Sequence, residues 1–179
     1  MADTKVSGLV AAAAALTTHE LPVNEAGTSK KVTGSQLRAL AWAMNGASAY
    51  QATQQLMPAT GVLAVLKYDT IVDTDGNYDV TANKGRYTAT VAGKYLVMGG
   101  FAVVTTNTTL GLMLYKNGVA FKQLSFHVNT YAGAYCYGSG RIKLAIGDYI
   151  ELAGQQGAAA QNTNATQLLT WMDVQFMGT

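Results

Sequence analysis

The sequence predicts an all-β protein, an antiparallel sandwich or barrel preceded by a small N-terminal segment of mixed α/β structure. Short runs of alternating apolar and polar residues follow one another closely after Pro58, without helical runs between them. Asp-Gly and Asn-Gly turn signals separate several of these runs. The composition also shifts at Pro58, from alanine-rich and glutamine-rich sequence to sequence that holds nearly all the tyrosines.

The strands of this region can be placed one by one. Arg86 to Val91 alternates, and the Ala92-Gly93 step leads into a longer strand. Asn117-Gly118 lies between two apolar runs and predicts a tight hairpin. Residues 140–154 predict a second hairpin that turns at Gly147-Asp148. The last strand places five side chains on one face: Leu168, Thr170, Met172, Val174 and Phe176.

The first 58 residues read as an attachment segment and linker, and residues 59–179 as the sandwich. Alanine favours a short helix from Val6 to Leu16 over a secretion signal. Glu20–Asn24 and Ser29–Thr33 form a predicted hairpin around a turn at Ala26-Gly27. Ser35 then caps a helix whose apolar face carries Leu37, Leu40, Ala41 and Met44, and residues 47–58 continue as helix.

Composition limits the partners. Charged residues make up 12% of the 179 residues, against about 25% in a typical domain. The net charge is +2 and no long basic run is present, which disfavours nucleic acid as a partner. No apolar run reaches the roughly 18–20 residues of a membrane-spanning helix, so we expect no membrane insertion. The single cysteine, Cys136, reads as a small buried hydrophobe.

One predicted strand is apolar on both faces. Tyr95, Val97, Phe101 and Val103 alternate with Leu96, Met98, Ala102 and Val104, and residues 110–115 are nearly as apolar. A sandwich strand is expected to be polar on its outer face. We therefore expect the chain to hide the second face in a permanent homo-oligomer; the alternative is a larger monomer with its faces exchanged. The interface candidates are Tyr95, Val97, Phe101, Leu112, Leu114 and Trp171.

Four elements of this region resemble the globular head of the complement q-subunit and its tumour-necrosis-factor-like relatives. They are Tyr68 with Asn77-Tyr78-Asp79, Gly85-Arg86-Tyr87-Thr88 leading to Gly93-Lys94-Tyr95, the "LMLYKNGV" hairpin, and "RIKLAIGDYIEL". The resemblance spans about Gly61 to Thr179 and implies a jelly roll of about ten strands that assembles as a homotrimer. The closing "WMDVQFMGT" matches the family's last strand only approximately.

The front of the chain is similar to an N-terminal segment of many virion proteins of tailed bacteriophages. The matching residues are Glu20-Leu21-Pro22-Val23, Gly27 to Thr33, and Gln36-Leu37. The similarity implies attachment to a virus particle, assembled in the host cytoplasm, through the major capsid protein or another virion protein. The residues expected to make this attachment are Leu21, Pro22, Val23, Lys30, Lys31, Val32 and Leu37.

Catalytic and cofactor motifs are not found. His19 and His127 are the two histidines, and neither lies in a nucleophile or metal-ligand arrangement. The sequence has no phosphate-binding glycine loop, so we expect a protein that is not an enzyme and uses no cofactor. The Asp73–Asp79 loop alternates oxygen donors but fails the helix-loop-helix calcium pattern, leaving a solvated turn or an ion of another geometry.

Tyrosines in a loop rich in Gly, Ser and Asn point to a contact surface. Tyr131, Tyr135 and Tyr137 fit either a ligand such as a host-surface glycan or packing between subunits. The function that the sequence favours is that of a trimeric capsid decoration or head-fibre protein. The alternatives are a tail-fibre tip that recognises the host surface and, in another class, a secreted lectin-like binding module.

Overall fold

The computed structural model describes residues 20–25, 28–33, 46–73, 77–104, 109–128 and 134–179, and the chain divides into two compact units, 1–43 and 44–179. The described part of the first unit is a hairpin of β1 (Glu20–Glu25) and β2 (Thr28–Thr33), with Glu20 opposite Thr33. This confirms the predicted hairpin. The predicted helices at 6–16 and after Ser35, and the turn at 26–27, lie outside the described residues.

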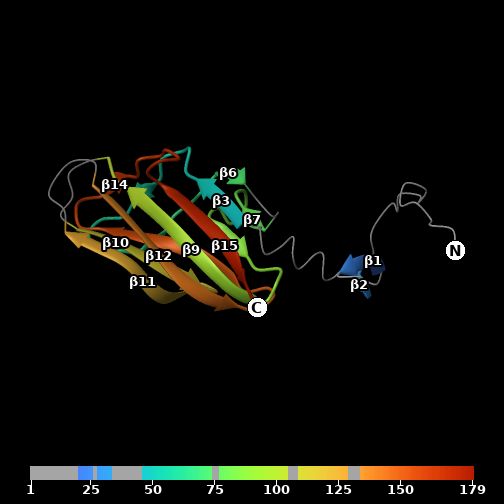
Figure 1. Cartoon of the computed structure of the whole chain (residues 1–179). Helices are drawn as coiled ribbons and strands as arrows, with labels where there is room; N and C mark the ends of the chain where they lie inside the picture. Colours follow the sequence, from blue (N-terminus) through green and yellow to red (C-terminus); the bar gives the residue numbers. More distant parts are fainter. Residues whose placement is uncertain (1–19, 26–27, 34–45, 74–76, 105–108, 129–133) are drawn as a thin grey trace. The chain divides into compact units, whose positions relative to one another are not determined.

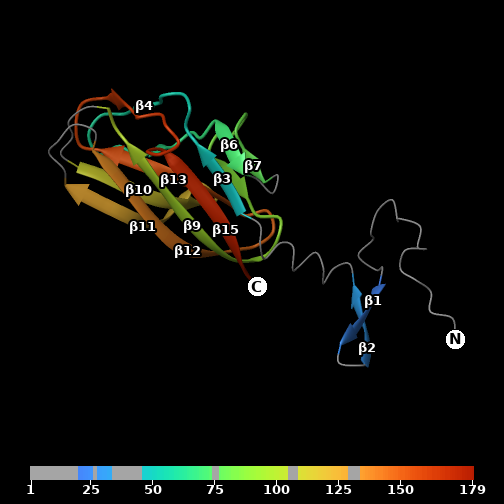
Figure 2. The ribbon, with the colours of Figure 1, turned by 45° about the horizontal axis from the view of Figure 1, so that its top comes forward.

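The second unit is a sandwich of two antiparallel sheets (Figures 1 and 2). Its first sheet has the order β12-β9-β15-β3-β6 and consists of β12 (Tyr135–Leu144), β9 (Gly93–Ala102), β15 (Trp171–Gly178), β3 (Gly46–Tyr50) and β6 (Thr70–Asp73). The second has the order β11-β10-β13-β8-β7, with β5 also paired to β13.

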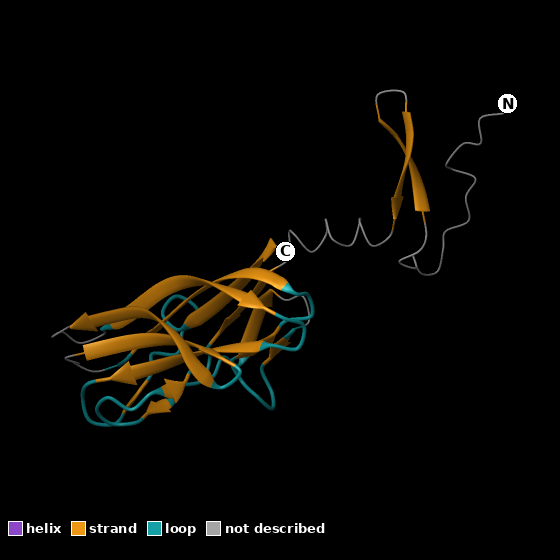
Figure 3. Ribbon diagram, turned by 90° about the horizontal axis from the view of Figure 1, so that it is seen from below, coloured by secondary structure: helices purple, strands orange, loops and turns teal. Residues whose placement is uncertain are grey.

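The strands of the second sheet are β11 (Val119–Val128), β10 (Thr109–Lys116), β13 (Tyr149–Gln156), β8 (Arg86–Thr88), β7 (Tyr78–Asp79) and β5 (Ala64–Val65). A short pair joins β14 (Gln161–Asn162) and β4 (Leu56–Met57). All regular elements of the described residues are strands (Figure 3). The predicted all-β antiparallel sandwich is therefore confirmed.

The two predicted hairpins have different outcomes. Asn117 and Gly118 have φ of 51° and 78°, as the tight turn between β10 and β11 requires, and that hairpin is confirmed. The turn at Gly147-Asp148 also exists, but β12 pairs with β9 and β13 pairs with β10. The chain therefore crosses from one sheet to the other there, and the second prediction of a hairpin is wrong. Connections that cross between the two sheets are typical of a jelly roll.

Asp148 ties this crossing to the neighbouring turn. Its carboxylate accepts hydrogen bonds from Asn117 Nδ2 and the amide of Ala145, both at 2.8 Å, and pairs with Lys116 Nζ at 2.8 Å. The Asn117 side-chain amide, followed by Lys116 and the Ala145 amide, holds the pKa of the Asp148 carboxyl well below its usual range. The two turns are thus fixed to one another at this end of the sandwich.

Residues 46–50 correct the predicted helix that continued to Pro58. They form β3, which pairs with β15 on one side and with β6 on the other. Ala47 and Ala49 are buried against the core, so pairing on both edges outweighs alanine's small preference for helix. The second unit begins at Met44. The boundary placed at residue 58 from the sequence therefore falls inside it.

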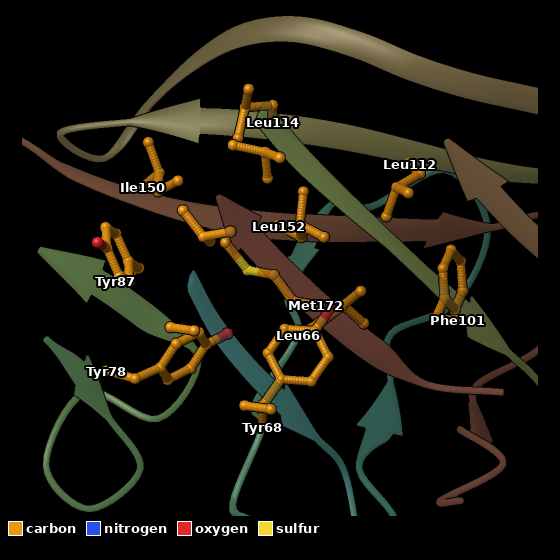
Figure 4. Packing of buried hydrophobic residues seen from close by; sticks show 14 of the residues in the cluster. Leu66, Tyr68, Tyr78, Tyr87, Phe101, Leu112, Leu114, Ile150, Leu152 and Met172 are labelled. Carbon is orange, nitrogen blue, oxygen red and sulfur yellow. The ribbon is translucent and has the colours of Figure 1, made fainter. Parts of the chain in front are cut away.

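A row of aromatic rings crosses the core. Tyr68, Tyr78, Tyr87, Tyr95 and Phe176 contact in sequence, edge to face, with centroid separations of 6.5, 6.3, 5.9 and 5.2 Å. Each such pair contributes about 0.5–1.5 kcal/mol beyond the burial of apolar area. Figure 4 shows three of these tyrosines beside Leu66 and Met172 between the sheets. The tyrosines that carry the family resemblance are therefore neighbours in one contact chain.

One end of this row carries two buried hydroxyl groups. The hydroxyl oxygens of Tyr68 and Tyr78 are buried and have no hydrogen-bond partner among the described residues. Burial raises the pKa of both phenols well above the usual value. Both groups therefore stay neutral in the core.

Five of the six interface candidates belong to this core. Tyr95, Val97, Phe101, Leu112 and Leu114 are at most 1% exposed, and Figure 4 shows the last three among the buried side chains between the sheets. Side chains that one chain already buries have no surface to offer a second copy, so their predicted place at a trimer axis does not fit. The half-exposed face of β9 carries Leu96 and Met98 instead.

We expect Gly85→Ala to lower the free energy of unfolding by more than about 1–3 kcal/mol, the cost of backbone strain alone. Gly85 has φ +92°, and a Cβ there would lie 2.1 Å from the carbonyl oxygen of Leu66. Gly61 has φ +76° and nothing within 4 Å of an added Cβ, so Gly61→Ala is the matched control. We expect it to lower the free energy of unfolding by about 1–2 kcal/mol. Urea unfolding at one protein concentration measures both; equal losses would contradict the clash.

Candidate functional site

An aromatic row lies on the outer face of the β12-β9-β15-β3-β6 sheet, the face that points away from the core. Tyr137, Gly100, Trp171 and Tyr50 stand opposite one another on four adjacent strands. Gly100 has no side chain, and a Cβ there would lie 3.2 Å from the Cβ of Tyr137. Tyr135 stacks on Tyr137 with ring centroids 5.9 Å apart and planes 14° apart. This surface is called the aromatic face.

The aromatic face is hollowed. A cavity of about 250 Å³ lies between Tyr135, Tyr137 and Trp171, with Leu168 on its rim. A second cavity of about 230 Å³ adjoins Trp171 on its other side and is lined by Tyr50 and Val72 among others. The exposed fractions of Tyr135, Tyr137 and Leu168 are 52%, 61% and 86%. Large apolar side chains that surround hollows of this size fit the protruding side chains of another protein surface.

The middle of the same face is more polar. Met98 stands opposite Asp173, which in turn stands opposite Ser48. The Ser48 hydroxyl donates a hydrogen bond of 2.5 Å to Asp173 Oδ1. The carboxylate is thus oriented along the sheet, and this part of the face combines a methionine with a positioned acceptor.

A second exposed apolar surface lies on β11, the edge strand of the other sheet. This strand pairs with β10 alone and runs beside β12 along one side of the sandwich (Figures 1 and 2). Four of its five large apolar side chains are about half exposed or more: Val119, Phe121, Phe126 and Val128. A sheet edge of this kind, without proline, is a ready template for contact with another chain. This surface is called the apolar edge.

The structure brings together part of the predicted site. Trp171, Tyr135 and Tyr137 share the aromatic face, whereas Tyr131 lies outside the described residues. In the first unit, Leu21, Pro22 and Val23 stand opposite Val32, Lys31 and Lys30 in the β1–β2 register. These six attachment candidates therefore belong to one hairpin, and the seventh, Leu37, lies outside the described residues.

Four residues of these surfaces were missed in the sequence. Tyr50 and Leu168 flank Trp171, but Tyr50 lies in a segment predicted as helix and Leu168 in the predicted last strand, which begins only at Trp171. Phe121 and Phe126 do not fit a single alternation because β11 has register shifts against β10 between Leu112 and Met113 and between Leu114 and Tyr115. The five large apolar side chains of "VAFKQLSFHV" were the available signal.

The loop that follows Asp79 is closed by its carboxylate. Asp79 Oδ1 accepts the amides of Thr81 and Ala82 at 2.8 and 3.0 Å, and Oδ2 accepts the amide and side-chain nitrogen of Asn83 at 2.9 and 3.0 Å. Both oxygens are therefore engaged in a turn. Among the described residues, no group of three or more His, Cys, Asp or Glu is placed to hold a metal.

Asp79 gives the fold a testable pH dependence. The amides of Thr81 and Asn83 lower the pKa of its carboxyl from 3.8 to about 2. Because the folded-state pKa is depressed, the stabilisation is present above pH 3.8 and is lost as pH falls through about 2. We expect Asp79→Asn to lower the melting temperature at neutral pH, by a difference that shrinks across this window. A difference that stays constant with pH would contradict the assignment.

The remaining reactive side chains offer no catalytic arrangement in the described part of the chain. Cys136 is buried, and burial raises the pKa of its thiol. The His127 ring lies 6.5 Å from that of Tyr137; His19 lies outside the described residues. The described residues form no helix that is long and apolar enough to cross a membrane.

The two sheets and their crossings form a jelly roll, and solved structures of tumour-necrosis-factor-like and complement-q proteins are similar to it in fold. Murine APRIL at pH 5.0 has a TM-score of 0.57 at 12% identity, over 73% of this chain and 97% of that one. The globular domain of zebrafish complement 1qA protein has a TM-score of 0.54 at 12% identity, over 74% and 96%.

A third similar structure is the Eiger TNF of S. frugiperda, with a TM-score of 0.51 at 12% identity, over 73% of this chain and 90% of that one. At such identities the likeness establishes the fold. No protein-family model and no curated protein matches the sequence.

Proposed function

We propose that this chain is a non-enzymatic structural protein of a bacteriophage particle whose jelly-roll head forms a homotrimer. The proposed self-association rests on one observation. A single head exposes two separate apolar surfaces, the aromatic face and the apolar edge. Burying apolar surface contributes roughly 25 cal/mol per Å², so exposed rings such as Tyr137 and Phe121 favour a covered state.

The difference between the two surfaces favours a ring. An interface with two-fold symmetry joins a surface to the same surface of its partner, whereas a head-to-tail interface joins two unlike surfaces and closes around a rotation axis. The apolar edge of one copy placed on the aromatic face of the next covers both surfaces in every copy. The resemblance stated from the sequence implies that the ring has three members.

The virion role rests on the N-terminal unit. Its β1–β2 hairpin holds the "ELPVNE" and "TSKKVT" segments that are similar to bacteriophage virion proteins. This unit is separate from the head, as an attachment module for a capsid or tail partner would be. On this similarity we propose a capsid decoration or head-fibre protein, with the virion as its location.

A tail-fibre tip that binds the host surface is the second candidate. The stacked pair of Tyr135 and Tyr137 beside a cavity of about 250 Å³ favours it, because sugar rings pack well on aromatic planes. A secreted lectin-like module would use the same pair. Specific retention of the full chain on a glycan array supports these alternatives over a decoration protein.

Removal of residues 1–43 tests the attachment. We expect heads of residues 44–179 to keep their oligomeric state but to be lost from purified particles, whereas the full chain is incorporated. The matched control is a full chain with Lys84→Gln, an exposed change in the head. Particles that incorporate the shortened protein at the full-length level would overturn the attachment role.

A further inference from the structure

Three cations gather at the end of the aromatic face that lies farthest from the tyrosines. Lys94 on β9 stands directly opposite Lys143 on β12, and Arg141 lies two residues before Lys143 on the same face. All three side chains are exposed. Like charges directly opposite one another on a sheet destabilise it, so the fold keeps an unfavourable arrangement here.

None of these three cations forms an ion pair among the described residues; the nearby carboxylate of Asp148 is paired with Lys116, whose Nζ donates to the carbonyl oxygen of Lys143 at 3.1 Å. Neither ion pair of the described head involves the cluster, since Glu151 pairs with Arg86 and Asp148 with Lys116. Asp173 is the acidic residue carried by β3, β9, β12 and β15. It stands opposite Met98, farther along β9 than Lys94, and accepts its hydrogen bond from Ser48. The three charges therefore face solvent together.

The cluster surrounds a hollow. Lys94, Arg141 and Lys143 line a cavity of about 230 Å³ with Ile142 and Met177. The thioether and methylene groups of Met177, 46% exposed, form an apolar wall beside the charges. Such a wall reduces the local dielectric constant and strengthens the attraction of the three cations for an anion.

We propose that this hollow binds a phosphate or sulfate group. A guanidinium can donate two parallel hydrogen bonds to a tetrahedral oxyanion, and two ammonium groups add point charges from the other side. A carboxylate offers fewer oxygens to three donors. The group can be a free ion or a substituent on an anionic polymer, and the chemistry of recognition is the same.

The position of the site links it to assembly. This step rests on the proposed homotrimer: if the aromatic face is covered by neighbouring copies, three such clusters approach one another at one end of the assembly. Their mutual repulsion opposes association, and a bound oxyanion in each hollow offsets it. Phosphate is then expected to stabilise both the head and its oligomer.

The test measures the melting temperature of the full chain as inorganic phosphate or sulfate is added, against sodium chloride at equal ionic strength. A ligand bound only to the folded state raises stability in a saturable way. We expect Lys94→Gln/Lys143→Gln to raise the half-saturating phosphate concentration about tenfold or more, equivalent to roughly 1.4 kcal/mol. Lys94→Arg/Lys143→Arg is expected to keep the response, as is Lys84→Gln, which removes one exposed charge elsewhere on the head.

The outcomes separate the possibilities. No saturable response of the wild-type chain, or an equal loss in Lys84→Gln, overturns the site. A dextran sulfate arm distinguishes the sources: much tighter binding than that of inorganic sulfate assigns the site to a polymer, and equal binding per sulfate assigns it to the free ion. Light scattering on the same samples tests assembly separately, because a monomer that still responds to phosphate refutes the trimer and leaves the site standing.

Discussion

In the homotrimer that we propose, Tyr137→Glu is expected to separate the copies into monomers. Tyr137 is 61% exposed in one chain and contacts the rings of Tyr135 and His127 outside the core, so the change leaves the packing between the sheets intact. In the assembly the new carboxylate would be buried without a partner, which costs about 3–5 kcal/mol. Such a loss raises the dissociation constant roughly a hundredfold or more. Light scattering at micromolar concentration measures the mass directly.

A substitution outside both surfaces is the control for the introduced charge. Val62 is 53% exposed and lies between β4 and β5, in neither the aromatic face nor the apolar edge. Val62→Glu introduces the same charge and is expected to leave the oligomer unchanged. If Tyr137→Glu keeps its oligomeric mass while folding normally, the aromatic face is not the interface.

Phe101→Ala is expected to destabilise the protomer itself. Phe101 is fully buried, and its ring lies 3.0 Å from where a Cβ on Gly154 would stand, which shows that β9 and β13 close tightly around it. Truncation of a buried phenylalanine costs about 3–5 kcal/mol through lost contacts and a residual cavity. Urea unfolding in the monomeric Tyr137→Glu background measures this loss without a contribution from dissociation.

The neighbouring position provides the contrast. Leu96 lies on the opposite face of the same strand and is partly exposed. We expect Leu96→Ala to change protomer stability by less than about 1 kcal/mol in that background and to weaken the oligomer in the otherwise unchanged chain. The reverse pattern, in which Phe101→Ala dissociates the oligomer and leaves the protomer stable, would restore the interface that the sequence suggested.

The sandwich could be predicted because its signals are local. Alternation along β8, the Asn117-Gly118 turn and the front hairpin each depend on residues close in sequence, and all three are confirmed. The tyrosines that carry the resemblance also mark real positions, since four of them contact in one row. Signals of this kind need no knowledge of the partner strand.

The predictions are wrong where the partner strand, rather than the local sequence, determines the structure. Tyr95 and Leu96 are both apolar, so alternation alone could not show which side of β9 meets the second sheet. The turn at Gly147-Asp148 has the residues of a hairpin, yet β12 and β13 take different neighbours. Residues 47–50 are rich in alanine, and only their pairing with β15 and β6 makes them a strand.

For the same reason, only part of the candidate site could be predicted from the sequence. Tyr135, Tyr137 and Trp171 were chosen as aromatics, and the sheet register places them on one face with Tyr50. Lys94 and Lys143 are 49 positions apart in sequence, counted from their residue numbers, and only the β9–β12 register sets them opposite one another. Sites formed across strands are therefore harder to predict than the strands themselves.

A diffraction or cryo-electron-microscopy map of the purified full chain tests most directly whether the aromatic face is covered by copies of the same chain. The proposal predicts a particle of three times the 18.8 kDa of one chain, with Tyr137 and Trp171 of each copy in contact with a neighbour. A map that shows these rings in solvent, with no second copy against the β12-β9-β15-β3-β6 sheet, would contradict it.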